Sequence, residues 1–164
     1  MTPDHGNQPV GSKVELSAIV PISIRHVDVK ALHAQYRDAL ASISGSYEII
    51  YVIDGAFGEV IAGLDELLRA GEKLTAVYLT RTFGESTALM AGFEQALGAV
   101  ILTLPAYYQI DPADIGKLVS ALGSADIAVA RRWPRVGGPA ERLRRWAFHG
   151  LVRWMTGLSL HDLG

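Results

Sequence analysis

A carboxylate stands directly after one of the most apolar runs of the chain. The run Tyr47 to Ile53 is followed by Asp54 and Gly55. An aspartate at such a place can accept a hydrogen bond from a base imide or a ribose hydroxyl, and the glycine lets the backbone turn closely. An Asx turn that leads into the next helix explains the same residues equally well. The sequence therefore leaves a nucleotide contact and a turn residue as open alternatives.

Two further loops carry side chains that suit a ligand. Arg81 and Gly84 precede a helical pattern and could face a phosphate, although a turn with Ser86 near the helix cap is the more frequent origin of such a sequence. His26 lies in the loop after the first apolar run, where histidines are more often solvated than ligating. Pro21 is expected to end that run, because proline cannot donate to a β ladder.

The stretch "PAYYQID", residues 105 to 111, is unusual for the end of a central strand. In a nucleotide-handling α/β domain, carboxylates that hold a metal ion are expected there. This chain offers Pro105, Ala106 and two tyrosines, Tyr107 and Tyr108. Proline contributes only a carbonyl, and a tyrosine phenol, with a pKa of about 10, is a poor anionic ligand. Neither Mg²⁺ nor Mn²⁺ is therefore expected at this strand end.

The hydrophobic pattern predicts the elements that position these residues. Short apolar runs, typical of strands covered on both faces, alternate with helical stripes. The runs cover residues 16–20, 47–53, 75–79, 99–104 and 126–130, and the stripes cover 32–43, 60–68, 88–97 and 115–122. This alternation predicts an α/β fold with a Rossmann-like, mainly parallel sheet flanked by helices. Ligands bind such sheets beyond the carboxyl ends of the strands, where the loops above are expected to meet.

Length and composition fit one globular domain. The chain has 164 residues, of which 49% are hydrophobic, and a formal net charge of −2, which argues against nucleic acid as a partner. It has no cysteine, which excludes disulfides and thiolate metal sites and fits a cytoplasmic location. No apolar run is long enough to span a membrane. Residues 1–14 are expected to be a disordered leader, and residues 15–164 the domain.

The C-terminal fifth of the chain is basic and amphipathic. Between residues 141 and 158, apolar residues that include two tryptophans recur at steps of three and four, opposite a cationic side. A helix packed on the domain's own core is the plainer interpretation. The alternatives are a helix in the headgroup layer of an anionic membrane, peripheral at its inner face, and a homodimer interface. Arg131, Arg132 and Arg135 follow the fifth predicted strand and could reach a diphosphate, unless they form a solvated basic loop.

The ordered set of motifs resembles family 2 glycosyltransferases of the GT-A fold, in particular the branch that transfers sugars to dolichyl or polyprenyl phosphate. The resemblance covers about residues 15 to 164 with the spacing kept. The branch motifs "VDDGS", "RNFG", "ALxAGxxxAxG", "DxDxQxDPxDI" and "LTGxxLxDxG" fall on residues 52–56, 81–84, 88–98, 105–115 and 155–164. The domain then corresponds to the nucleotide-binding half of such an enzyme. Because family members of this branch continue beyond the last motif, the domain is expected to stop short at Gly164.

The resemblance also assigns residues. It implies that the nucleotide-binding residues are Pro21, Asp54, Arg81 and Gly84, and that Gln109 and Asp162 are the candidates for catalysis. Both metal-binding aspartates of the family fall on Pro105 and Tyr107. We expect at least one of the rings of Tyr107 and Tyr108 to fill the donor-sugar site, which leaves a smaller, more apolar cleft with Asp54 at its mouth.

These departures leave two interpretations of function. In the first, which the sequence favours, the domain is a pseudoenzyme that binds a nucleotide or a partner without efficient sugar transfer. In the second, it is an active, metal-independent transferase that moves a sugar from a nucleotide donor to a polyprenyl-phosphate-type acceptor, with arginines in place of the cation. Losing a metal takes fewer coordinated changes than replacing it. A receiver domain is rejected, because Ile22 and Ser23 stand where it needs an acidic pair.

Overall fold

The computed structural model describes residues 14–23, 28–107 and 110–130. The chain divides into two units, Met1–Gly123 and Ser124–Gly164. All the helices and strands of the described residues belong to the first unit. They are β1 (Leu16–Ile22), α1 (Val29–Ile43), β2 (Tyr47–Ile53), α2 (Gly58–Arg69), β3 (Thr75–Tyr78), α3 (Glu85–Gln95), β4 (Val100–Thr103), the 3-10 turn η1 (Pro112–Asp114) and α4 (Ile115–Leu122).

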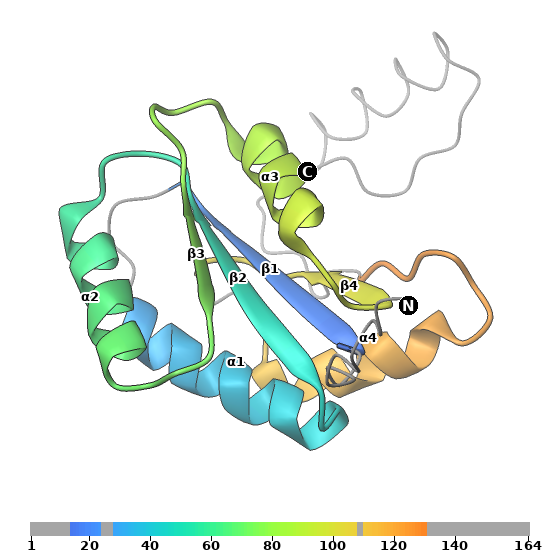
Figure 1. Cartoon of the computed structure of the whole chain (residues 1–164). Helices are drawn as coiled ribbons and strands as arrows, with labels where there is room; N and C mark the ends of the chain where they lie inside the picture. Colours follow the sequence, from blue (N-terminus) through green and yellow to red (C-terminus); the bar gives the residue numbers. More distant parts are fainter. Residues whose placement is uncertain (1–13, 24–27, 108–109, 131–164) are drawn as a thin grey trace, which may run out of the picture. The chain divides into compact units, whose positions relative to one another are not determined.

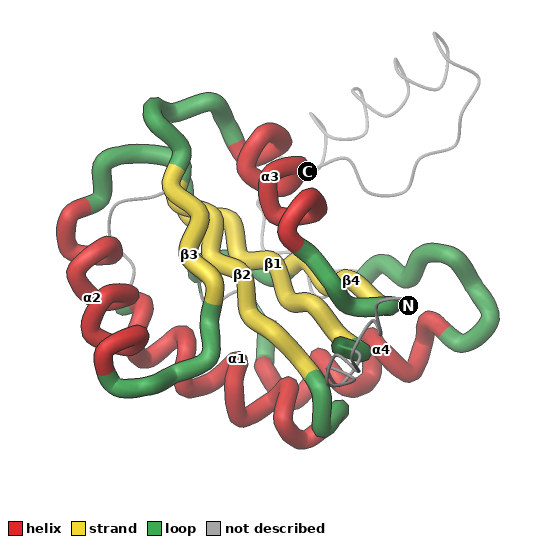
Figure 2. The backbone as a smooth tube through the Cα atoms, viewed as in Figure 1, coloured by secondary structure: helices red, strands yellow, loops and turns green. Residues whose placement is uncertain are grey.

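The four described strands form one parallel sheet in the order β3-β2-β1-β4 (Figure 2). β1 and β2 lie in the middle and pair along their whole length, from Leu16 with Tyr47 to Ile22 with Ile53. All seven residues of β1 are buried, as are the last five of β2. The predicted α/β class, with a Rossmann-like parallel sheet flanked by helices, is thus confirmed, and the apolar runs at β1 and β2 are those of strands covered on both faces.

The helices cover the two faces of this sheet unequally (Figure 1). α1, α2 and α4 pack on one face, where Leu32, Leu64 and Ile115 join the larger apolar core. Of the described helices, only α3 lies on the other face, over β1 and β2. There Gly92 allows the close approach, because a Cβ atom at this position would lie 2.4 Å from Cγ2 of Ile19. The "AG" pair of the α3 motif is therefore explained by packing.

The expectation that Pro21 ends the first strand is wrong. β1 continues to Ile22, and Pro21 pairs with Val52 of β2. The ladder between β1 and β4 ends just before this point, where the carbonyl of Ile19 accepts from the N–H of Leu104 at 2.9 Å. Residues 19 and 21 turn their backbone groups to the same side, so the proline nitrogen faces past the end of β4. The missing N–H therefore costs no ladder bond.

The predicted fifth strand, residues 126–130, is also wrong. Residues 124–130, the described part of the second unit, contain no strand. Ile127 and Val129 are 78% and 82% exposed. An apolar run becomes a strand only where neighbouring backbone pairs with it, and none of the described backbone does so here. Composition alone could not supply that neighbour.

Candidate functional site

The loops after the strands meet at one edge of the sheet. Ile22, Ile53 and Tyr78 end β1, β2 and β3 at the same level, because Ile22 pairs with Ile53 and Ile53 pairs with Tyr78. β4 pairs with the first half of β1, and the chain continues from it into Leu104 and Pro105. The carboxyl edge predicted to hold the site therefore exists, and residues 54–57, 79–84 and 104–107 follow β2, β3 and β4 there.

Asp54 is fully buried at this edge, and its carboxylate is occupied by the neighbouring loop. Oδ1 accepts from the N–H of Phe83 at 2.7 Å, and Oδ2 accepts from the N–H of Gly84 at 2.8 Å. The backbone N–H of Asp54 donates to the carbonyl of Ile22 at 2.9 Å. Asp54 thus joins the ends of β1 and β2 to the turn before α3. Neither alternative considered from the sequence included this connection.

The turn that Asp54 holds presents an arginine. Gly84 is the N-cap residue of α3 with a φ of +99°, in a region that favours glycine, and Ser86 lies within the first turn of the helix. Phe83 is 45% exposed, and Cζ of Arg81 lies 4.8 Å from the centre of its ring, in a cation–π arrangement. Thr82 adds a long hydrogen bond of 3.4 Å from its hydroxyl to the carbonyl of Asp54. The predicted nucleotide contacts Asp54, Arg81 and Gly84 are therefore brought together in one assembly.

The end of β4 is held in a different way. The phenol of Tyr36, a buried residue of α1, donates to the carbonyl of Pro105 at 2.7 Å. Leu104 and Ala106 are buried, and Tyr107 is 46% exposed. This turn is therefore tied to the helix layer by a neutral hydrogen bond. The predicted filling of a donor-sugar site by Tyr107 or Tyr108 stays a prediction, since Tyr108 lies outside the described residues.

The side chains at the end of β4 do not fit the Mg²⁺ or Mn²⁺ ion that the resemblance implies. Hard cations need several oxygen donors, and carboxylates are the preferred ones. Here the carbonyl of Pro105 already accepts from Tyr36, Ala106 has no donor, and Tyr107 offers a phenol. Across residues 14–23, 28–107 and 110–130, no three His, Cys, Asp or Glu residues gather where they could hold a metal ion.

The remaining predicted residues divide into two groups. Pro21 is buried inside β1, and its proposed nucleotide contact stays a prediction. The other candidates lie outside the described residues: His26, Gln109, Arg131, Arg132, Arg135, Asp162 and the amphipathic segment 141–158. Within the part of the chain that is described, no helix is long and apolar enough to cross a bilayer.

Asp111 belongs to another region. Its carboxylate accepts from the N–H of Ala113 at 3.0 Å and caps η1. Together with Gln35 and Asp38 it lines a groove of about 440 Å³ between α1 and η1. The groove lies on the helix layer and not among residues 54–57, 79–84 and 104–107. It is therefore separate from the candidate site.

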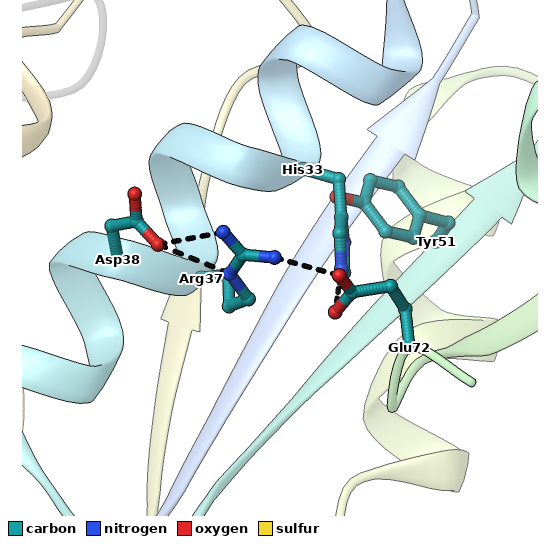
Figure 3. A network of polar contacts seen from close by, with 5 residues as sticks. All are labelled: His33, Arg37, Asp38, Tyr51 and Glu72. Carbon is teal, nitrogen blue, oxygen red and sulfur yellow. Dashed lines mark hydrogen bonds and ion pairs between the residues drawn. The ribbon is translucent and has the colours of Figure 1, made fainter. Parts of the chain in front are cut away.

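Sequence reasoning missed a polar network at α1 that is built around the buried side chains of His33 and Tyr51 (Figure 3). His33 is 1% exposed; its Nδ1 lies 3.1 Å from the hydroxyl of Tyr51 and its Nε2 lies 3.3 Å from Oε2 of Glu72. Burial lowers the pKa of His33 and outweighs Glu72, which raises it. A neutral ring that donates from Nε2 to Glu72 and accepts at Nδ1 from Tyr51 satisfies all three groups. Arg37 donates to Oε1 of the same glutamate at 2.6 Å.

The network joins α1 to β2 and to the loop that leads into β3. The network therefore lies on the face of the sheet that α1 covers and not at the carboxyl edge. Burial also raises the pKa of Tyr51, which keeps its phenol protonated. The spacing of His33, Tyr36 and Leu40 at i, i+3 and i+7 was the signal that could have placed this histidine on the buried side of α1.

Comparison with known proteins identifies the family. Residues 17–161 match the model of glycosyl transferase family 2. Dodecaprenyl-phosphate galacturonate synthase of Rhizobium johnstonii is 33% identical over 162 residues, which cover 96% of this chain and 48% of the relative. The undecaprenyl-phosphate 4-deoxy-4-formamido-L-arabinose transferase of Pectobacterium carotovorum is 32% identical over 151 residues, which cover 91% of this chain and 46% of the relative. The chain thus spans about half the length of these relatives.

Solved structures share the fold. The mannosyltransferase PcManGT from Pyrobaculum calidifontis, in complex with GDP-Man and Mn²⁺, matches with a TM-score of 0.53 at 16% identity, over 74% of this chain and 36% of that one. TarS residues 1–349 from S. aureus match with a TM-score of 0.52 at 16% identity, over 77% of this chain and 38% of that one. These likenesses show the GT-A fold. The match of residues 17–161 to the family model shows that the chain belongs to glycosyl transferase family 2.

Proposed function

We propose that the chain is the nucleotide-sugar-binding half of an active glycosyltransferase that moves a sugar from a nucleotide donor to a polyprenyl-phosphate acceptor. The observation that carries this proposal is the likeness to two transferases named for dodecaprenyl and undecaprenyl phosphate, at 33% and 32% identity. Because the chain covers less than half of each relative, the acceptor site would be completed by residues outside it.

The carboxyl edge supports the donor side of this reaction. In the transfer, a phosphate oxygen of the acceptor attacks the anomeric carbon of the sugar, and the bond from that carbon to the nucleotide diphosphate breaks. The diphosphate leaves with the bonding electron pair, so it needs cationic partners. At the edge, the exposed guanidinium of Arg81 is such a group. Arg131, Arg132 and Arg135 are the further candidates that we propose.

The second candidate function is a pseudoenzyme that binds a nucleotide or a partner without sugar transfer. Its support is the chemistry of the β4 end, where Pro105 and Tyr107 offer no carboxylate for a cation. We rank it second, because the similarity to transferases named for polyprenyl phosphates extends over 96% and 91% of this chain. It predicts nucleotide binding without product.

The test is a transfer assay with the full-length protein, a panel of nucleotide sugars and undecaprenyl phosphate, with and without EDTA. We expect labelled sugar to appear on the lipid for one donor, at a rate that EDTA leaves unchanged. Nucleotide binding without product for every donor would favour the pseudoenzyme, and the absence of nucleotide binding would contradict both candidates. Arg81→Gln should slow transfer, whereas Arg69→Gln, which removes an exposed arginine at the end of α2, should not.

A lipid acceptor also supports peripheral attachment to a membrane through residues 141–158, with Trp and Arg side chains in the headgroup layer. Co-sedimentation with anionic liposomes tests this part of the proposal. Binding should require anionic lipid, weaken with salt, and fall when Arg142, Arg145 and Arg153 become glutamine. If the protein stays in the supernatant at low salt, the segment is a packing element or, if the protein is dimeric in solution, a homodimer interface.

A further inference from the structure

We propose that Asp54 is a positioning residue, which holds the turn of residues 81–84 so that Arg81, supported on the Phe83 ring, forms a binding site for a diphosphate group. The inference rests on the proposed function, because that function supplies a ligand with a diphosphate. It differs from the direct nucleotide contact implied by the family resemblance, since Asp54 then acts through two other residues and does not touch the ligand.

The carboxylate of Asp54 is hydrogen-bonded to the backbone of the turn. Both of its oxygens accept backbone hydrogen bonds, at 2.7 Å from Phe83 and 2.8 Å from Gly84, and the residue is completely inaccessible to solvent. Hydrogen bonds to an ionised acceptor are among the stronger ones in proteins. Asp54 therefore has its main partners within the protein, and a ligand at the edge would meet the turn before it met the carboxylate.

These hydrogen bonds orient the turn of residues 81–84. The two bonds fix the consecutive backbone N–H groups of Phe83 and Gly84. They thereby also fix the direction in which the side chain of Phe83 projects from the backbone. Gly84, with a φ of +99°, allows the turn to enter α3 directly after them. A flexible loop would hold the ring of Phe83 in no single position, whereas a turn with two short hydrogen bonds to a buried strand end does.

The guanidinium of Arg81 lies over the ring of Phe83. Its Cζ atom lies 4.8 Å from the centre of the Phe83 ring, and an arginine stacked in this way keeps its N–H edge available for phosphate oxygens. Among the described residues, Arg81 forms no ion pair. The arginines and lysines that do form them, Lys30, Arg37 and Lys117, lie on α1 and α4, in the helix layer opposite α3. Arg81 is thus an exposed cation at the edge where the donor is proposed to bind, and no acidic side chain of the described residues forms an ion pair with it.

Inorganic pyrophosphate is the probe, because it carries the proposed ligand group without the unknown base. Its affinity for the full-length protein is measured by calorimetry at low salt. Arg81→Gln should weaken binding roughly tenfold, the effect of losing one charge-assisted contact. Asp54→Asn keeps the shape but places an NH₂ group opposite a backbone N–H, and it should weaken binding by a similar factor. The double variant should lose no more pyrophosphate affinity than either single variant, because both changes disrupt the same binding site.

Phe83→Leu provides an independent variant in case Asp54→Asn does not fold. It removes an exposed ring and leaves both backbone hydrogen bonds of the turn, yet it should weaken pyrophosphate binding as Arg81→Gln does. Phe93→Leu, at a ring of α3 that is 40% exposed, and Arg69→Gln are the matched controls and should bind within about twofold of wild type, a difference of under half a kcal/mol.

Three results would overturn the inference: wild-type pyrophosphate affinity in Asp54→Asn, losses that multiply in the double variant, or wild-type affinity in Phe83→Leu. A fall in stability alone would make Asp54 structural and nothing more. These failures are distinct from failure of the proposed function. Sugar transfer with unchanged pyrophosphate binding in the variants would sink only the inference, and the expected pyrophosphate pattern without any transfer product would sink only the proposed function.

Discussion

The ends of β2 and β4 lie on the same edge of the sheet and are held by opposite chemistry. At the end of β2, a buried carboxylate accepts two backbone hydrogen bonds from the turn before α3. At the end of β4, a backbone carbonyl accepts one hydrogen bond from the neutral phenol of Tyr36. The first end joins two loops to each other and presents an arginine. The second end joins a loop to a helix and presents a half-exposed tyrosine.

This difference shows that the position of an acidic residue directly after a strand is not enough to identify it as a ligand contact. Asp54 stands where a nucleotide-binding carboxylate is expected, yet its oxygens organise the protein. The sequence predicts no acidic metal ligands at the turn of Pro105. The hydrogen bond that holds this turn comes from the neutral phenol of Tyr36.

Asp54→Ala should produce the largest loss of stability. It removes an ionised acceptor and leaves two backbone N–H groups at a buried position without a partner, which costs about 3 kcal/mol in the free energy of unfolding. Urea denaturation measures it. The control is Glu94→Ala, which removes an exposed carboxylate from α3 and should cost under about 0.5 kcal/mol. A loss below about 1 kcal/mol for Asp54→Ala would show that the carboxylate does not hold the turn.

Tyr36→Phe should have a smaller effect, because the hydrogen bond at the end of β4 is neutral and the ring stays in the core. We expect a loss of about 1 kcal/mol in the free energy of unfolding. Tyr47→Phe, at the partly buried start of β2, is the matched control for removing a phenol. If Tyr36→Phe proved more destabilising than Asp54→Ala, the contrast between the two ends would be reversed.

The pH dependence of stability should come from the helix layer and not from the β4 end. His33 has its pKa lowered from 6.5 in the folded protein by burial, so the unfolded chain binds its proton more readily. The contribution of His33 to the free energy of unfolding is therefore fully present above the unfolded pKa. It falls as the pH drops from 6.5 toward the folded pKa. Glu72, whose pKa is lowered mainly by its hydrogen bond with His33, adds to the loss only at pH values near and below 4.5.

Urea titrations between pH 7 and pH 5 measure this slope, a window that covers the ordinary titration range of histidine. The slope should persist in Tyr36→Phe, which changes no charge in this range, and should flatten in His33→Gln. An unchanged slope in His33→Gln would move the acid sensitivity to another group and contradict the assignment.

Phe83→Leu should have the smallest effect on stability, within about 0.5 kcal/mol, because the ring is exposed and the backbone bonds to Asp54 remain. The same variant is expected to lose pyrophosphate affinity. Urea denaturation of one preparation measures how well the turn is held by Asp54. Calorimetry of the same preparation measures how well the turn positions Arg81 for pyrophosphate. A loss above about 1.5 kcal/mol would show that the ring belongs to the core and would weaken the distinction.

Much of the fold could be predicted from local patterns. The runs at β1, β2, β3 and β4 and the four helical stripes were placed within a few residues, because apolar periodicity follows directly from which face is buried. The two errors in the placement of strands concern pairing. Pro21 stays inside β1 because β4 ends beside it, and residues 126–130 form no strand because no described backbone pairs with them.

The sequence by itself determined the family, the parallel α/β class and the set of loops that gather at the carboxyl edge, since these depend on motif order and on periods of two and 3.6 residues. Only the tertiary structure decided what the polar side chains of those loops contact. Asp54 reaches residues 29 and 30 positions away, and Tyr36 reaches a carbonyl 69 positions away. Such partners are fixed by strand order and by the packing of helices on the sheet, which bring distant segments within hydrogen-bonding distance, and no local pattern encodes that distance.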